Sequence, residues 1–385
     1  MAVKPAPITG SVLEWAIRDA GLSMSEVADK VEVTEGQLRT WLYDDETSHP
    51  SVTQLRKLAK LLGRPESFFF LESPPLKDPV PVEFRNFAGS SGRPGPQTVE
   101  GIKLARRIQK THAWIRQRGN EERVALASID LGSDPESVAE VLRSWLGWST
   151  GEQLKLTEAK VAKEFRAALQ SRGILALNLT LDEDITRGFS LHHPYAPLVA
   201  ANTRDPHQAR LFSYAHELVH LCLGEDVVCG THGAAKMGVE RFCNRVASAL
   251  LMPRREFVEY KKSKFGPGKI SELDQVRTLK NRFRVSMRAA AIRLDELGLA
   301  SSGLYEKVDN SATVDKKKAG GFYTPGAERT RPVIRVDTYG HEFIGKLFAA
   351  EEKGLLRRRQ ISELLSVSDK ELTEVRRLSL AGVDE

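Results

Sequence analysis

The segment that most restricts how this chain can fold is an apolar helix that carries two histidines. Between Arg210 and Leu223 the apolar residues recur at helical spacing, which predicts one amphipathic helix. His216 and His220 lie four residues apart within it, so both imidazoles project from the same face, one turn apart. Two imidazoles at this spacing can bind a single metal ion, and the sequence therefore predicts a metal site on this helix.

Glu217 follows the first histidine directly. From that position a carboxylate can reach a water bound to the metal and act as a general base. The metal lowers the pKa of that water toward about 7, which produces a nucleophile near neutral pH. The alternative is an exposed helix with two unrelated histidines, but the apolar residues around the pair and the strands expected before it favour the metal site.

A catalytic zinc site needs a third protein ligand and one open position. Asp226 lies six residues after His220, but the glycine that this short pattern requires is at position 224 and not at 223. The better candidate is Glu240, at the start of a second helix expected over 239–251, and His232 in the intervening loop is a weaker one. A lone glutamate at the start of a helix can also be a solvated residue that the helix dipole favours. Spacing alone therefore does not decide whether Glu240 is a metal ligand.

Other residues near these candidates suggest supporting roles. Asn244, one helical turn after Glu240, is a candidate for orienting a metal ligand through a hydrogen bond. Cys229 lies in the loop before Glu240, and its thiolate is a candidate for filling the open metal position and holding the site latent. The simpler interpretation, which the sequence favours, makes Cys229 a small apolar loop residue. Cys222 and Cys243 are expected in the core.

The elements expected around the histidine helix form one unit. A helix over 157–173 comes first, and the segment 270–299 is helical again. Between the first helix and the histidines, three short apolar strands are expected at 174–179, 188–191 and 197–202. The predicted fold class is therefore mainly α with a small β-sheet, an α+β architecture, and residues 151–300 form its central domain.

Residues 11–70 predict a separate domain of five short helices. Ser23, with Glu26 three residues later, has the pattern of a capping box, and Thr34 caps the following helix. Helices over 23–31 and 34–42, joined by a tight turn, form a helix-turn-helix whose second helix is the recognition helix. Its candidate DNA-binding residues are Thr34, Gln37, Arg39 and Thr40.

Proline, glycine and charge mark the remaining boundaries. Six prolines and three glycines within 71–98 indicate a linker. Residues 99–150 are expected to form a basic helical connector. After a glycine- and lysine-rich break, residues 301–385 end in a small helical region that either senses a ligand or caps the fold.

The positive charge of the chain is not where the helix-turn-helix lies. The net charge is +6 and the pI about 9.1, which suggests nucleic acid as a partner. Residues 11–70 hold 7 Lys/Arg against 10 Asp/Glu, a net charge of −3, whereas residues 101–125 hold 7 against 2, a net charge of +5. Because phosphate contacts supply most nonspecific affinity, DNA binding by residues 11–70 would rely on dimerisation and on the basic segment 101–125, which includes the basic helix 101–118; otherwise the domain binds a protein partner.

Within the basic helix, Trp114 is a candidate for stacking on single-stranded nucleic acid, although a solvated charged face is the simpler interpretation. No run of about 18 apolar residues predicts a membrane span. The N-terminus lacks the apolar run of a secretory signal, and three cysteines do not make a disulfide framework. A cytoplasmic protein, with a homodimer as one arrangement, is the expectation.

The combined pattern resembles the ImmA/IrrE family of metallopeptidases. The matching stretches are 157–173, 174–179, 197–202, 210–221, 240–253 and 285–299. The resemblance implies that His216, His220 and Glu240 bind Zn²⁺ and that Glu217 is catalytic. It also implies a zincin-like domain and a substrate class, since members cleave helix-turn-helix repressors in response to DNA damage or mobile-element signals.

Residues 11–70 separately resemble an XRE-type helix-turn-helix domain, and its fusion to such a peptidase is familiar in that family. The leading hypothesis is a zinc-dependent endopeptidase that cleaves a DNA-binding repressor or partner protein. Its small sheet would bind an extended substrate segment as an added edge strand. The residue that stabilises the oxyanion is not assigned; Tyr195, Tyr214 and Tyr260 are candidates by type only.

Two alternatives stay open. One is an XRE-type transcription regulator whose metallopeptidase fold serves as a sensor or dimerisation module. The other is an antitoxin-like partner of another protein. The presence of Glu217 favours the peptidase, because a site that had lost catalysis would be expected to lose this residue first.

Overall fold

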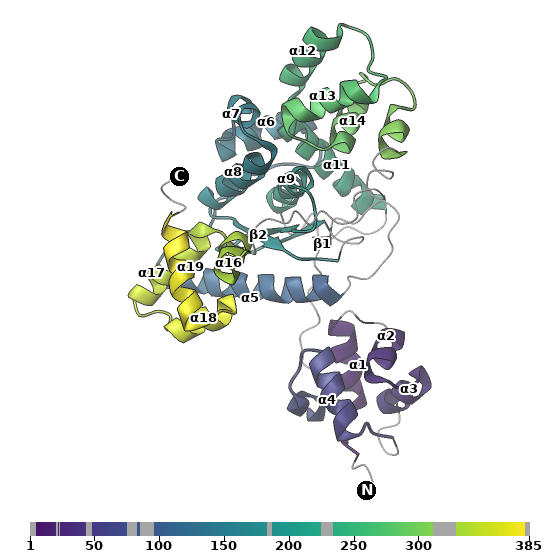
Figure 1. Cartoon of the computed structure of the whole chain (residues 1–385), viewed down its shortest axis with the longest axis vertical. Coiled ribbons are helices and arrows are strands. Elements are labelled where there is room, and N and C mark those ends of the chain that lie inside the picture. The colour runs from purple at the N-terminus through teal and green to yellow at the C-terminus, as the bar shows by residue number, and fades with distance from the viewer. Residues whose placement is uncertain are drawn as a thin grey trace. The chain divides into compact units, whose positions relative to one another are not determined.

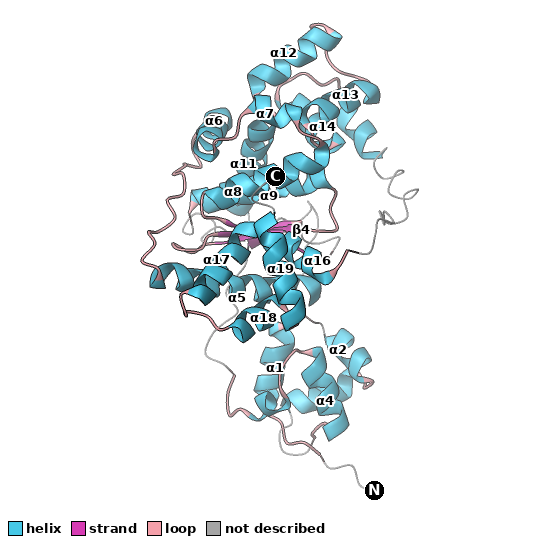
Figure 2. Ribbon diagram, turned by 60° about the vertical axis from the view of Figure 1, so that its left-hand side comes forward, coloured by secondary structure: helices cyan, strands magenta, loops and turns pink. Residues whose placement is uncertain are grey.

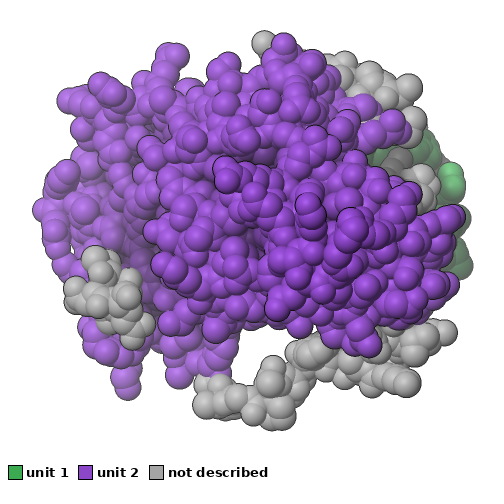
Figure 3. Space-filling model, turned by 90° about the horizontal axis from the view of Figure 1, so that it is seen from above, with its two compact units in different colours: residues 1–82, 86–104, 180–186 green, residues 83–85, 105–179, 187–385 purple. Residues whose placement is uncertain are grey.

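The computed structural model describes residues 5–20, 22, 24–43, 48–74, 83–84, 96–182, 187–224, 234–310 and 329–381. The chain separates into two compact units, one of residues 1–82, 86–104 and 180–186 and one of residues 83–85, 105–179 and 187–385 (Figure 3). In the described ranges, no helix is long and apolar enough to cross a membrane.

The first unit contains a bundle of short helices, as the sequence predicts (Figure 1). The elements are α1 (Gly10–Asp19), α2 (Met24–Val31), α3 (Glu35–Tyr43), α4 (Val52–Leu61) and the 3₁₀ helix η1 (Glu66–Phe70). Trp41, Leu58 and Phe69 are buried in its core. The Thr34 cap is present, since its Oγ1 accepts a hydrogen bond from the Gln37 amide, whereas Ser23 lies outside the described residues.

The second unit is built on a small mixed sheet with strand order β1-β3-β4-β2. β2 (Leu175–Leu179) runs parallel to β4 (Leu198–Asn202), and β3 (Gly188–Leu191) is antiparallel to β4. These three strands lie within a residue of their expected bounds. A fourth, β1 (Glu83–Phe84), pairs with the other edge of β3 and was not expected, because it falls in the segment predicted to be a linker.

Helices cover both faces of this sheet, which explains why its three longer strands are buried along their whole length. α8 (Glu158–Ser171) and α9 (His207–Leu223) lie on one face. α16 (Arg331–Tyr339) and the second-unit part of α5 (Pro96–Arg118) lie on the other (Figures 1 and 2). The Gln109 side chain of α5 donates hydrogen bonds to the carbonyls of Leu191 and Ala196.

A further layer of helices packs against α9. It contains α6 (Pro135–Leu146), α7 (Thr150–Lys155), α11 (Ala234–Leu251), α12 (Arg254–Phe265), α13 (Leu273–Phe283) and α14 (Met287–Glu296). Val138 and Leu142 of α6 belong to the same core as Leu218 of α9. A boundary at residue 151 would divide that core, so we propose that the central domain begins before residue 135.

The C-terminal helices are α16, α17 (His341–Glu352), α18 (Arg358–Leu365) and α19 (Asp369–Ala381). Buried Arg166 of α8 joins them to the sheet. Its Nε donates to the Ala176 carbonyl at 2.7 Å, and its two terminal nitrogens donate to the carbonyls of Asp337 at 2.6 Å and Thr338 at 3.0 Å. The guanidinium therefore caps the C-terminal end of α16, where a positive charge is favourable.

Candidate metal centre and active site

The helix that carries both histidines is held against the sheet by a buried tyrosine. The Tyr214 hydroxyl of α9 donates hydrogen bonds to the Leu177 carbonyl at 3.1 Å and to Asn178 Oδ1 at 2.8 Å. Asn178 Nδ2 in turn donates to the Asp337 carbonyl of α16 at 3.2 Å. The position of α9 is thus tied through β2 to the C-terminal helices. Since its hydroxyl is used in this way, Tyr214 is not available to stabilise an oxyanion.

Gly188 allows β3 to approach α9 closely. A Cβ at this position would lie 2.7 Å from the Ala200 carbonyl oxygen, 3.4 Å from Ser213 Cβ and 3.5 Å from Glu217 Cγ. Any larger residue would push β3 away from its neighbours. The close approach places the start of β3 directly beside Glu217.

Three side chains that can bind a metal converge on one point. His216 Nε2 and His220 Nε2 are 3.1 Å apart, and the two Glu240 carboxylate oxygens lie 3.3 Å and 3.4 Å from these nitrogens. Ligand atoms about 2.0–2.1 Å from a tetrahedral ion lie about 3.3 Å from one another. The three side chains therefore fit a zinc-sized ion, and α11 contributes Glu240 as the sequence predicts.

The charges of this cluster stabilise one another. Hydrogen bonds from His216 and His220 overcome the effect of burial and hold the pKa of Glu240 well below its usual value. Burial would lower the pKa of His220, but hydrogen bonds to Cys243 and Glu240 and the charge of Glu217 outweigh it and raise that pKa well above normal. Such a concentration of negative charge around two imidazoles is also what a divalent cation requires.

Glu217 is buried, with 1% of its surface exposed. It follows His216 on α9, close enough to raise the pKa of His220 through its charge. Glu217 is thus a buried carboxylate beside the candidate metal-binding cluster, and its role as a general base stays a prediction.

Cys243 is a neighbour of the cluster that the sequence had placed in the core. It is indeed fully buried, but it also hydrogen-bonds to His220. The spacing could have shown this, because Cys243 lies three residues after Glu240 and so on the same side of α11. Asn244 is partly exposed one turn after Glu240, and its orienting role stays a prediction. Asp226, Cys229 and His232 lie outside the described residues.

The DNA-binding candidates Thr34, Gln37, Arg39 and Thr40 are all exposed at or on α3. Leu38 and Trp41 of the same helix are buried. This leaves one polar face of α3 turned to solvent, as a recognition helix requires. Arg39 lies 4.0 Å from Glu35, an exposed pair that costs little to separate.

Several basic side chains of α5 are used in contacts within the second unit. Arg107 donates to the Glu363 carbonyl at 2.7 Å, and Arg116 donates to the Tyr195 carbonyl and pairs with Glu121 at 2.9 Å. Two of its cations therefore hold the second unit together. Trp114 is 38% exposed, with the Arg118 guanidinium over its ring.

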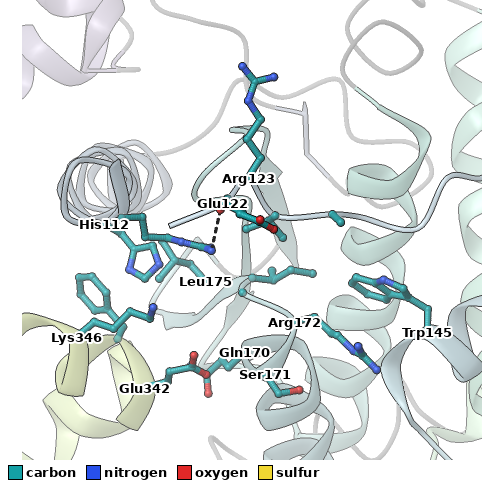
Figure 4. A pocket seen from close by; sticks show the side chains of 16 residues that line it. His112, Glu122, Arg123, Trp145, Gln170, Ser171, Arg172, Leu175, Glu342 and Lys346 are labelled. Carbon is teal, nitrogen blue, oxygen red and sulfur yellow. Dashed lines mark hydrogen bonds between the residues drawn. The ribbon is translucent and has the colours of Figure 1, made fainter. Parts of the chain in front are cut away.

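A cavity of about 470 Å³ lies apart from the histidine cluster, between α5, the end of α8, β2 and α17. His112 and Lys346 stand side by side on one wall, and Gln170 and Arg172 lie across from them (Figure 4). Lys346 is paired with both oxygens of Glu121. Burial, with the charges of Lys346 and Arg116, lowers the pKa of His112 to about 3, so this histidine is neutral.

Two protein families match parts of the chain. The IrrE N-terminal-like domain, of the peptidase M78 family, matches residues 169–295, and a helix-turn-helix family matches residues 13–69. Both matches lie where the sequence predicts them, and they confirm the fusion of a helix-turn-helix domain to an ImmA/IrrE-like segment. No curated protein matches the chain.

Proposed function

We propose that this chain, which joins a helix-turn-helix domain to an IrrE N-terminal-like domain, is a zinc-dependent endopeptidase. Its proposed activity is the regulatory cleavage of a DNA-binding protein. One observation carries the proposal: the two His Nε2 atoms and the Glu240 carboxylate meet at 3.1–3.4 Å, beside a buried glutamate. This is the His₂Glu ligand set of catalytic zinc sites, in which a fourth position stays open.

The residues divide the chemistry between them. His216, His220 and Glu240 would hold the ion, which supplies a Lewis acid and lowers the pKa of a bound water. Glu217 would accept the proton of the attacking water as the new C–O bond forms, and would then deliver that proton to the leaving amine as the peptide C–N bond breaks. β3 packs closely against α9 at Gly188, beside the Glu217 side chain, and we infer that this packing restricts the movement of Glu217.

The proposed substrate is a helix-turn-helix repressor or another partner protein. The resemblance to the ImmA/IrrE family supports this class, and so does the sheet beside α9, whose edge can bind an extended segment by backbone hydrogen bonds. Such binding selects exposed, extended segments and disfavours folded cores.

The test compares zinc-loaded wild-type protein with Glu217→Gln on purified candidate repressors, with products identified by mass spectrometry. We expect cleavage by the wild type and a loss of at least about 100-fold in the variant, because general-base catalysis contributes 10²–10⁴-fold. Glu164→Gln, an exposed carboxylate on α8, is the matched control and should cleave normally. If Glu217→Gln retains zinc and cleaves at the wild-type rate, the proposed mechanism is wrong.

The first unit supports a second activity, DNA binding through α3. Its exposed Gln37 and Arg39 are the groups we propose to contact base edges or phosphates. Gln37→Ala and Arg39→Ala should weaken binding to the protein's own promoter in mobility-shift assays, whereas Arg56→Ala, on α4, should not. If none of these substitutions changes binding, α3 does not contact the DNA.

A further inference from the structure

The outer edge of β3 is the sheet edge that a substrate segment would need. Within the described part of the sheet, β3 pairs with β4 on one side through Gly188–Leu191. The same strand approaches α9 at Gly188, beside Glu217. An extended segment that joined β3 on its other side would therefore lie next to the catalytic helix.

That edge is already occupied by the chain itself. β1 pairs antiparallel with β3, with Glu83 opposite Ser190 and Phe84 opposite Phe189. Residues 83–85 group with the second unit, whereas the residues on both sides of them, 1–82 and 86–104, group with the first. A short piece of the connection between the two units is thus built into the sheet of the candidate peptidase.

We propose that β1 occupies the substrate-binding edge of β3, so that the connecting segment and an extended protein substrate compete for the same backbone groups. The inference rests on the proposed function, since it takes the site beside α9 to bind substrate. The outward-facing N–H and C=O groups of an edge strand can hydrogen-bond to only one added strand at a time. Cleavage of another protein therefore requires β1 to leave.

The geometry favours exchange over permanent blockage. β1 pairs over two residues, and β3 is four residues long. A substrate segment that pairs along all of β3 gains more backbone hydrogen bonds than β1 gives up. Because β1 is tethered to the sheet by the chain, its effective concentration is in the millimolar range. It therefore prevents weakly binding substrate segments from pairing with β3, whereas tightly binding segments displace it. An event that acts on the first unit can shift this balance through the chain connection alone.

The test measures competition directly, without hydrolysis. Zinc-loaded full-length Glu217→Gln protein is titrated into a fluorescent synthetic peptide with the sequence of residues 78–90, and anisotropy reports binding. In the same background, Glu83→Pro with Phe84→Pro removes both β1 amide donors. We expect this variant to bind the peptide at least about 10-fold more tightly, because the tethered competitor is gone.

Ser90→Pro with Ser91→Pro is the matched control, and it should behave like the parent protein. A peptide that carries the two prolines in place of Glu83 and Phe84 should not bind. Equal binding by the parent and the β1 variant, or no binding by either, would overturn the proposal.

Hydrogen exchange provides a second readout that needs no peptide. Amides of β3 should exchange faster in the β1 proline variant than in the control, while those of β2 stay unchanged. Unchanged exchange in β3 would count against β1 pairing. Neither measurement depends on catalysis, so a protein that cleaves nothing can still show the competition, and an active peptidase can fail to show it.

Discussion

At the scale of single residues, the site is specified by a few side chains whose roles differ. His216 and His220 follow from spacing alone, because a helix places residues four apart on one face. Glu240 needs the fold to bring it within 3.4 Å of the imidazoles. The sequence does not predict the hydrogen bond between Cys243 and His220, because a cysteine in an apolar helix is most simply a core residue.

The first prediction concerns the third ligand. Glu240→Gln should lower zinc affinity by more than about 100-fold, since even residues that only support metal ligands cost 10–100-fold. Chelator competition on purified protein measures the affinity. Glu259→Gln, an exposed carboxylate on α12, should bind zinc like the wild type. Unchanged affinity in Glu240→Gln would remove this residue from the ligand set.

The second prediction concerns His112. Its pKa in the folded protein is about 3, below the unfolded value of about 6.5, so the unfolded chain takes up this proton first as the pH falls. Stability due to the neutral histidine is therefore complete above pH 6.5 and is lost between pH 6.5 and 3. The loss is about 2 kcal/mol of unfolding free energy between pH 7 and 5.

Urea unfolding at the two pH values tests this. His112→Gln should reduce the pH dependence by that amount. Phe343→Leu, which removes the ring packed against His112 at 5.5 Å, should lower stability equally at both pH values. The same pH dependence in His112→Gln and wild type would show that this histidine does not titrate as described.

At the scale of elements, the described helices and strands agree with the sequence-based prediction where the apolar periodicity is strong. They differ from it where contacts with distant residues determine whether an element forms. β2, β3, β4 and α9 were expected within a few residues. β1 was not, because a two-residue strand in a proline-rich stretch has no periodicity to detect. α7 was missed for a similar reason: its six residues are stabilised by buried Gln153, which hydrogen-bonds to the Leu251 and Phe283 carbonyls.

Arg166 supplies a prediction at this scale. Its guanidinium caps α16, so Arg166→Met should leave the Asp337 and Thr338 carbonyls without this donor. We expect the free energy of unfolding to fall by about 2–4 kcal/mol. Hydrogen exchange should accelerate over α16 first, and urea unfolding gives the loss. Arg172→Met, an exposed arginine after the same helix, should change neither. Unaltered exchange in α16 would mean that apolar packing alone holds it.

At the scale of the whole molecule, the described residues of the two units form separate hydrophobic clusters. Trp41, Leu58 and Phe69 belong to the first, and Leu142, Leu218 and Val246 to the second. The sequence predicts this division from the proline-rich stretch between them. It could not predict that part of the stretch joins the second unit, because that depends on a free strand edge far along the chain.

Separate cores predict two unfolding transitions. We propose that the metal binds only the folded second unit, so chelation should lower the temperature of one transition by mass action and leave the other in place. Calorimetry with and without chelator, repeated on His220→Ala, measures this. A single transition, or an equal shift of both, would show that the two units unfold together.

The segment that matches the IrrE N-terminal-like domain, residues 169–295, contains β2, β3 and β4 but neither β1 nor the two helices on the second face of the sheet. Cut out on its own, it would expose Leu177, Ala200 and their neighbours on that face to water, and it would lack α6 beside α11 as well. The candidate peptidase unit is therefore larger than the segment that the family matches. A shortened version of this protein therefore needs the sequence before and after that segment to keep these residues buried.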